Sequence, residues 1–206
     1  MRVGGSSRLA GLIVTTLAVG VCALSPLASP QSREFGRTIA AITVGQDRLD
    51  RVRSLYGSGA QTTVTGVQSL CYYVEQDQSY LSVSTFERES RVRSVMLTTF
   101  TYATPGCQDA RITGRHLTAS RGIALGDPMS KIIDALGQPA ETGTVRIGEH
   151  DLLVLDYLVS GGRVTCQFEH NKLVTIGVEF DDSAFDEAMR TTRFESDPIK
   201  MGFSTR

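Results

Sequence analysis

The sequence predicts an α+β fold made of two tandem units, each with a short helical segment packed on an antiparallel β-meander of three to four strands. A short amphipathic helix pattern with a glycine stop occurs twice, and alternating apolar runs follow each copy. The blocks around the two copies also match in the same order, which is typical of a tandem repeat. A lone helix on a small sheet has a small core, and two adjacent units can support each other.

The two helix patterns are AITVGQDRLDRVRSLYGSG (41–59) and GIALGDPMSKIIDALGQP (122–139). Asp47 and Asp127 are expected at the N-caps, where an Asp side chain accepts a backbone N–H that has no helical partner. Apolar residues then recur at helical spacing, so each helix buries one face. Each copy also has a glycine that is expected to end its helix. These are Gly57 and Gly137, which lie 80 residues apart.

Strands are expected after each helix. In the second unit, runs at 152–159, 163–170 and 173–180 alternate apolar and polar residues and are joined by short turns. In the first unit, the runs are 69–76, 79–88 and 91–100. Their alternation is less regular, because Leu81 and Val83 lie on the face opposite Phe86. Either both faces of this sheet are partly covered, or the register differs by one residue.

Two blocks match downstream of the helices. Phe86-Glu87-Arg88 resembles Phe168-Glu169-His170, and residues 91–95 resemble residues 172–176. The boundaries that follow are a signal peptide (1–23), a flexible segment (24–35), a first repeat (36–105), a linker (106–113), a second repeat (114–182), and a short C-terminal helix with a tail (183–206).

The first 23 residues have the pattern of a secretory signal peptide. Arg2 and Arg8 precede a short apolar run, and Val21-Cys22-Ala23 offers small side chains for cleavage. We expect a periplasmic or secreted protein with no integral membrane segment after cleavage. The alternatives are a retained membrane anchor and a lipid anchor on Cys22, which Val21 disfavours.

Three cysteines follow the signal peptide: Cys71, Cys107 and Cys166. They allow three single bridges. A Cys71–Cys107 disulfide is favoured, since in an oxidising compartment it would tie the first unit together. The alternative, three free thiols, is more typical of the cytosol.

The motifs of the second unit resemble the SmpA/OmlA group of small envelope proteins. The motifs on which this resemblance rests are Gly-Ile-x-Leu-Gly-Asp (122–127), Leu-Gly-x-Pro (136–139) and Phe-x-x-x-x-Leu-Val-x-Ile (168–176). Two copies in one exported chain also resemble the β-lactamase inhibitory protein. The resemblance implies helices on one face of antiparallel sheets, binding of protein partners and no chemistry. The sequence departs from these proteins in two ways. Val21 before Cys22 disfavours the lipid attachment of the SmpA/OmlA lipoprotein. The second unit has only Cys166 and lacks the disulfide that each unit of the inhibitory protein has, so no residue of this chain is assigned an inhibitory role.

No motif predicts a catalytic residue, a bound cofactor or a metal ion. His150 and His170 could meet across the meander, but no ligand spacing supports a metal site. The formal net charge of −1 gives no reason to expect nucleic acid as a partner.

The favoured function is therefore an exported, non-catalytic envelope protein that binds a protein or envelope partner through its sheet faces. Adjacent strand residues point to opposite faces, so one tyrosine of the Tyr72-Tyr73 pair must point away from the helix. The candidate contact residues are Tyr72, Tyr73, Tyr80, Leu152 and Val154. The alternative is that another layer, or the other unit, covers these faces. The alternative is a secreted inhibitor of an extracytoplasmic enzyme, and a small-ligand binder or an enzyme is a third possibility.

Overall fold

A large antiparallel sheet and two α-helices make up the computed structural model, which describes residues 36–100, 106–159 and 161–180. The described ranges belong to one compact unit. The predicted signal peptide (1–23), the segment 24–35 and the C-terminal helix and tail (183–206) lie outside the described residues. The structure is thus α+β and mostly β, as the sequence predicts.

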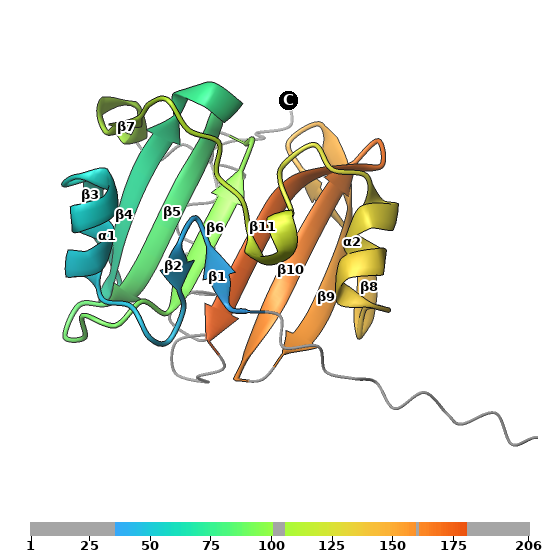
Figure 1. The fold of residues 1–206 in the computed structure, drawn as a ribbon, viewed down its shortest axis with the longest axis horizontal. Coiled ribbons are helices and arrows are strands. Elements are labelled where there is room, and N and C mark those ends of the chain that lie inside the picture. Colours follow the sequence, from blue (N-terminus) through green and yellow to red (C-terminus); the bar gives the residue numbers. More distant parts are fainter. Residues whose placement is uncertain (1–35, 101–105, 160, 181–206) are drawn as a thin grey trace, which may run out of the picture. The chain divides into compact units, whose positions relative to one another are not determined.

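The sheet has nine strands, and eight of them form a continuous antiparallel path (Figure 1). In spatial order these are β3 (Ala60–Val64), β4 (Val67–Val74), β5 (Ser79–Phe86), β6 (Ser94–Thr98), β11 (Lys172–Phe180), β10 (Gly162–Glu169), β9 (His150–Val159) and β8 (Glu141–Ile147). The ninth strand, β7 (Arg111–Ile112), pairs in parallel with β4. The central β6–β11 pair joins the strands of the first half of the chain to those of the second half.

Both helices lie on the same face of this sheet, α1 over the strands of the first half and α2 over those of the second (Figure 1). Helix α1 spans Leu49–Tyr56 and α2 spans Met129–Leu136. The short strands β1 (Thr38–Ile39) and β2 (Ile42–Thr43) form a separate hairpin on the same face. Three 3₁₀ turns complete the described elements: η1 (Glu75–Asp77), η2 (Cys107–Asp109) and η3 (Ser120–Gly122).

The predicted N-caps are wrong by one residue. The extended residues that precede α1 and α2 are Arg48 and Pro128, and neither helix has a side-chain cap. Instead, the Asp47 carboxylate accepts the N–H of Thr43 (2.7 Å). The Asp127 carboxylate accepts the N–H of Ala124 in the same way (2.8 Å). Each Asp therefore closes the turn before the helix.

The predicted glycine stops are confirmed. Gly57 and Gly137 follow the last helical residues with φ of 85° and 88°. Their N–H groups donate to the carbonyls of Arg53 and Ile133 at 2.8 Å. A residue with a Cβ is strained at this φ, so the end of each helix depends on glycine.

The loop before each helix is held by a residue that lies in, or just before, the last strand of its own half. The backbone bonds are Gly45 N–H to Val92 O (2.8 Å), Val92 N–H to Asp47 O (2.8 Å), Gly126 N–H to Leu173 O (2.7 Å) and Leu173 N–H to Asp127 O (2.9 Å). The same pattern of contacts thus positions α1 and α2.

A single hydrophobic core fills the space between the helices and the sheet. Val52 of α1 and Ile132 of α2 are both fully buried, and one contiguous cluster contains both of them. Strand residues that face the helices in both halves belong to the same cluster, including Leu70, Leu81, Val95, Cys166, Phe168 and Ile176. The two halves therefore share one core.

The irregular alternation in β5 reflects a sheet that is covered on both sides. Leu81 and Val83 face the helices with no exposed area. Phe86 is half-buried and pairs with Val67 on the opposite face. Phe168 faces the helices and is 2 % exposed. Phe86 and Phe168, which match in the sequence, thus point to opposite faces of the sheet.

Candidate interaction surface

The sheet has a second face, which points away from α1 and α2. Its residues follow from the alternation along each strand and from the cross-strand register. On the first half, they include Val64, Cys71, Tyr73, Tyr80, Ser82, Ser84, Ser94, Met96 and Thr98. On the second half, they include Val145, Leu152, Val154, Leu158, Arg163, Thr165, Thr175 and Gly177.

Exposed apolar side chains lie at the two margins of this second face. The large hydrophobic residues that are exposed among the described residues are Val64 (37 %), Val145 (37 %) and Leu158 (71 %), and all of them lie on it. Val64 is on the edge strand β3, whereas the other two are on β8 and β9. Exposed apolar residues on one face of a rigid sheet are typical of a contact surface.

The centre of the second face is polar and carries small side chains. Hydroxyl groups pair across the strands, Ser69 with Ser84 at 2.8 Å and Thr98 with Thr175 at 2.7 Å. The Thr165 hydroxyl donates to the Asp156 carboxylate at 2.5 Å. Each of these hydroxyl groups has a hydrogen-bond partner on a neighbouring strand, so the arrangement stabilises the sheet.

Tyr73 and Tyr80 lie on the second face, as strand alternation requires for one member of the Tyr72-Tyr73 pair. Their rings contact each other across β4 and β5 with centroids 5.3 Å apart. Both side chains are half-buried. They therefore present a paired aromatic surface at the margin formed by the first half.

Tyr72 is wrong as a surface-contact residue, because its side chain is fully buried on the helix face. Its ring contacts the ring of Tyr56 on α1, with centroids 5.8 Å apart. Its hydroxyl donates to the carbonyl of Gly57 at 2.9 Å. Burial raises the pKa of Tyr72 to about 12. Tyr72 thus anchors the end of α1 to the sheet.

Leu152 is a candidate contact residue that the structure buries. It lies on the second face, as predicted, but has no exposed area. Val154 lies on the same face and remains half-buried. The margin formed by the second half therefore presents Val145, Val154 and Leu158.

The Cys71–Cys107 disulfide is present, with 5.1 Å between the two Cα atoms. It joins β4 to η2, within the predicted linker 106–113, and Tyr73 N–H donates to Ala110 O at 2.8 Å beside it. The linker thus packs against the first half and adds β7 to the sheet.

Cys166 is a free thiol in the core, and Tyr157 lies on the neighbouring strand. Burial raises the pKa of each of these two groups to about 12. The protonated forms are thus favoured in the folded state, and an unfolded chain loses these protons at lower pH. Their contribution to stability is complete below about pH 9 and is lost as the pH rises towards 12.

We expect a Tyr157→Phe variant to flatten this pH dependence. The Tyr157 hydroxyl is buried and has no hydrogen-bond partner among the described residues, so its removal at pH 7 should not lower the free energy of unfolding. Urea unfolding of both proteins at pH 7 and at intervals from pH 9 to 11 measures the effect. If the free energy of unfolding fell equally steeply with pH in the two proteins above pH 9, the prediction would be wrong.

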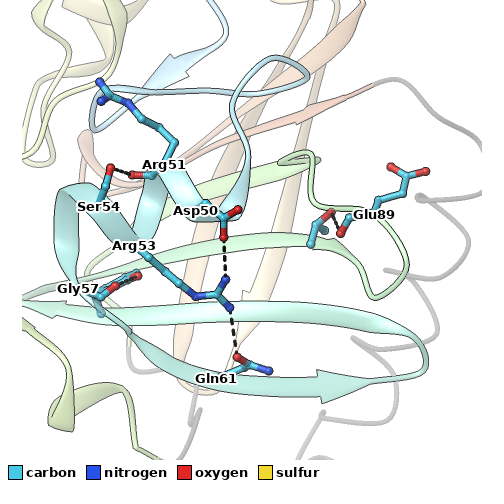
Figure 2. A network of polar contacts seen from close by, with 9 residues as sticks. Asp50, Arg51, Arg53, Ser54, Gly57, Gln61 and Glu89 are labelled. Carbon is cyan, nitrogen blue, oxygen red and sulfur yellow. Dashed lines mark hydrogen bonds and ion pairs between the residues drawn. The ribbon is translucent and has the colours of Figure 1, made fainter.

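The outer side of α1 is a charged surface whose groups bind one another. Figure 2 shows that Arg53 reaches both Asp50 within α1 and Gln61 on β3, each at 3.4 Å. The Ser54 hydroxyl donates to the carbonyl of Arg51 at 2.7 Å. These contacts are typical of a solvated helix surface.

Two histidines form exposed pairs with carboxylates. His150 Nδ1 lies 2.6 Å from Glu169, and the ring of His150 contacts Phe100 with centroids 5.1 Å apart. His116 pairs with Asp77 of η1. Within the described ranges, no group of three or more His, Cys, Asp or Glu residues is placed to hold a metal ion.

An open depression of about 230 Å³ lies beside the end of α1. Its lining residues are Tyr56, Ser58, Gly59, Ala60, Asp109 and Ala110. The Tyr56 hydroxyl already donates to the carbonyl of Ala40.

Neither helix in the part of the chain that the structure describes is long and apolar enough to cross a membrane.

No protein-family model matches the chain, and no curated protein matches it. Solved structures similar to it include a DUF4309 family protein of Bacillus subtilis, with 9 % identity over 68 % of this chain and 82 % of that chain, at a TM-score of 0.45. A cysteine-rich secretory protein of Staphylococcus aureus has 11 % identity over 67 % and 44 %, at a TM-score of 0.44. A "putative beta-lactamase inhibitor protein" of Streptococcus mutans has 12 % identity over 67 % and 90 %, at a TM-score of 0.25. These values are too low to assign the chain to a family or a function.

Proposed function

We propose that this protein is an exported, non-catalytic protein that binds a protein partner through the margins of its second sheet face. One observation carries the proposal: the exposed large hydrophobic residues of the described ranges, Val64, Val145 and Leu158, all lie on that face. The Tyr73–Tyr80 pair adds an aromatic surface beside them. Aromatic and apolar side chains of this kind supply most of the binding energy in protein interfaces.

We also propose that the two halves of the chain are tandem copies of one unit. The helices have the same length and lie 80 residues apart, and the same backbone bonds hold the loops before them. On the second face, Val64 corresponds to Val145, and their cross-strand partners Val67 and Leu152 correspond to each other. Duplication thus accounts for two apolar margins in equivalent positions, one on each half of a continuous sheet.

Export is supported by the disulfide. Structural disulfides persist in oxidising compartments, such as the periplasm or the medium outside the cell. The Cys71–Cys107 bridge agrees with the signal peptide expected at residues 1–23. We therefore place the protein in the periplasm or outside the cell, where the similarity of its motifs to SmpA/OmlA proteins also predicts a partner in the envelope.

The partner-binding proposal predicts that Leu158→Ser weakens capture of a specific envelope protein by at least about tenfold, the usual effect of truncating an important apolar contact. Leu158 is 71 % exposed, so the substitution should leave stability within about 0.5 kcal/mol of the wild type. Purified protein carrying a photo-crosslinker at position 73 is used to identify the partner in envelope extract. Titration with the purified partner then compares the variants.

A matched control is Asp134→Ser, an equally simple change at an exposed position on α2. It should bind the partner as the wild type does. Equal loss of binding in both variants, or no crosslinked protein in repeated extracts, would count against the proposal. If the captured partner is an exported enzyme and its activity falls on binding, the protein is an inhibitor of that enzyme.

A further inference from the structure

Strand β8 forms one edge of the sheet and has none of the features that usually protect such an edge. Among the described strands, it pairs only with β9, in an uninterrupted register over its 7 residues. Its sequence, ETGTVRI, contains no proline and no lysine, and none of its residues is buried. Natural proteins protect exposed edges with prolines, lysines, bulges or very short strands, because an unprotected edge pairs with another strand.

The peptide groups that β8 directs away from the sheet follow from its hairpin with β9. The hairpin closes at the pair Ile147–His150 across a two-residue turn. The closing pair of such a hairpin exchanges both hydrogen bonds, and hydrogen-bonded pairs alternate along the strands. Every second residue of β8, counted back from Ile147, thus bonds to β9. The intervening residues, whose peptide groups point outward, are Thr142, Thr144 and Arg146.

A second copy of β8 can bond to all of these outward groups in one register. Two copies of a strand related by a two-fold axis perpendicular to the sheet run antiparallel and keep their faces. Residues that oppose each other must then lie on the same face. With Thr144 opposite Thr144 of the second copy, Thr142 lies opposite Arg146, and about six hydrogen bonds join the two chains.

The side chains are complementary in this register. On the second face, Val145, which is 37 % exposed, lies opposite Gly143 of the other copy. A Cβ at Gly143 would have no atom within 4 Å, so there is open space for the valine. On the helix face, the two Thr144 side chains meet, and such Thr–Thr pairs stabilise a sheet. Glu141 and Arg146 each lie opposite an uncharged residue.

Strand β3, at the other edge, is less suited to self-pairing. It has 5 residues, and by the same hairpin rule only Gln61 and Thr63 direct peptide groups outward. A symmetric pair of β3 strands would therefore form only about four hydrogen bonds. Because Val64 corresponds to Val145, Thr63 is the counterpart of Thr144 and provides a matched control.

We propose that two copies of this protein pair through β8, antiparallel about a two-fold axis at Thr144. The sheets of the two copies then form one continuous sheet. Their Val145 side chains both lie at the junction, whereas Leu158 lies on β9, outside the paired strands. This inference concerns the purified protein alone and does not depend on the envelope partner proposed above, so its failure leaves that proposal unaffected.

Sedimentation velocity of the purified protein tests the dimer. Measurements extend to about 100 µM, where a dimer with a micromolar dissociation constant is almost completely formed. Thr144→Pro should raise the dissociation constant at least about tenfold, because proline removes an outward N–H and places its ring between the strands. The variant should keep its fold, since this N–H does not bond to β9. Thr63→Pro, the same change on β3, should dimerise like the wild type.

Oxidative crosslinking tests the register. Thr144→Cys should form a disulfide between copies, because the Cα atoms of a facing hydrogen-bonded pair lie about 5.5 Å apart. Thr142→Cys alone should not, since its two copies lie about four residues apart along the strands, or roughly 13 Å. A mixture of Thr142→Cys and Arg146→Cys proteins should crosslink. The wild type gives the background, because its free thiol, Cys166, is buried.

A protein that stays monomeric at every concentration would overturn the proposal, as would a Thr144→Pro variant that associates like the wild type. Equal weakening by Thr63→Pro, with species larger than a dimer, would also overturn it, because β3 and β8 of different copies would then pair head to tail. Crosslinking of Thr142→Cys alone would contradict the register. The crosslinking results keep the test decisive if Thr144→Pro fails to fold.

Discussion

Removal of the disulfide by a Cys71→Ala/Cys107→Ala double substitution should lower the free energy of unfolding by about 3–4 kcal/mol. The two cysteines are 36 residues apart. A bridge across a loop of that length restricts the unfolded chain by about this amount. In the folded state, the bridge also holds η2 against β4, beside the short strand β7. The loss should be visible in urea unfolding curves at pH 7.

A reducing agent provides the control for this prediction. Wild-type protein treated with dithiothreitol should approach the stability of the double variant, whereas the double variant should not respond to the reagent. A loss smaller than about 1 kcal/mol in the double variant would show that the unfolded chain is already restricted in this region. The bridge would then matter little for stability, and its presence would indicate only the compartment.

The helices can be predicted from local sequence because their ends depend on local chemistry. The glycines at 57 and 137 stop the helices at the expected residues. The predicted N-caps are wrong because an Asp that lies just before a helix can also bond to the turn that precedes it. Sequence spacing alone does not distinguish these two uses of the same side chain.

The inner strands can be predicted, but the edge strands cannot. Strand β10 buries every second side chain, and this produces the alternation seen in its sequence. In β8, ETGTVRI, no residue is buried and the alternation is absent. The pairing of β6 with β11 joins residues about 80 positions apart, which no local pattern reports. For that reason, a continuous sheet with one core cannot be distinguished from two adjacent small sheets by sequence pattern.

The candidate contact residues show the same limit. The sequence requires Tyr72 and Tyr73 to point to opposite faces, but the choice between them depends on where α1 packs. The contact of Tyr72 with Tyr56 makes that choice. The sequence places Leu152 on the correct face, but its burial depends on what covers the face. Face assignment is a local property, whereas exposure depends on tertiary packing.

Phe168→Ala should cost about 3–5 kcal/mol, the usual effect of removing a buried aromatic ring. Phe168 is 2 % exposed on the helix face, opposite Leu153 on β9 and Leu173 on β11. Phe86→Ala is the matched control, because Phe86 occupies the corresponding place in the sequence pattern. Phe86 is half-buried on the second face, so its removal should cost less than about 2 kcal/mol.

Urea unfolding followed by circular dichroism measures both variants. Because Val52 and Ile132 belong to one cluster, the Phe168→Ala protein should still unfold in a single transition, with no step for the first half alone. Equal losses in the two variants would mean that Phe86 and Phe168 occupy equivalent environments, contrary to their opposite orientations. A second transition in Phe168→Ala would mean that the halves have separate cores, and the continuous sheet would then act as an interface between two domains.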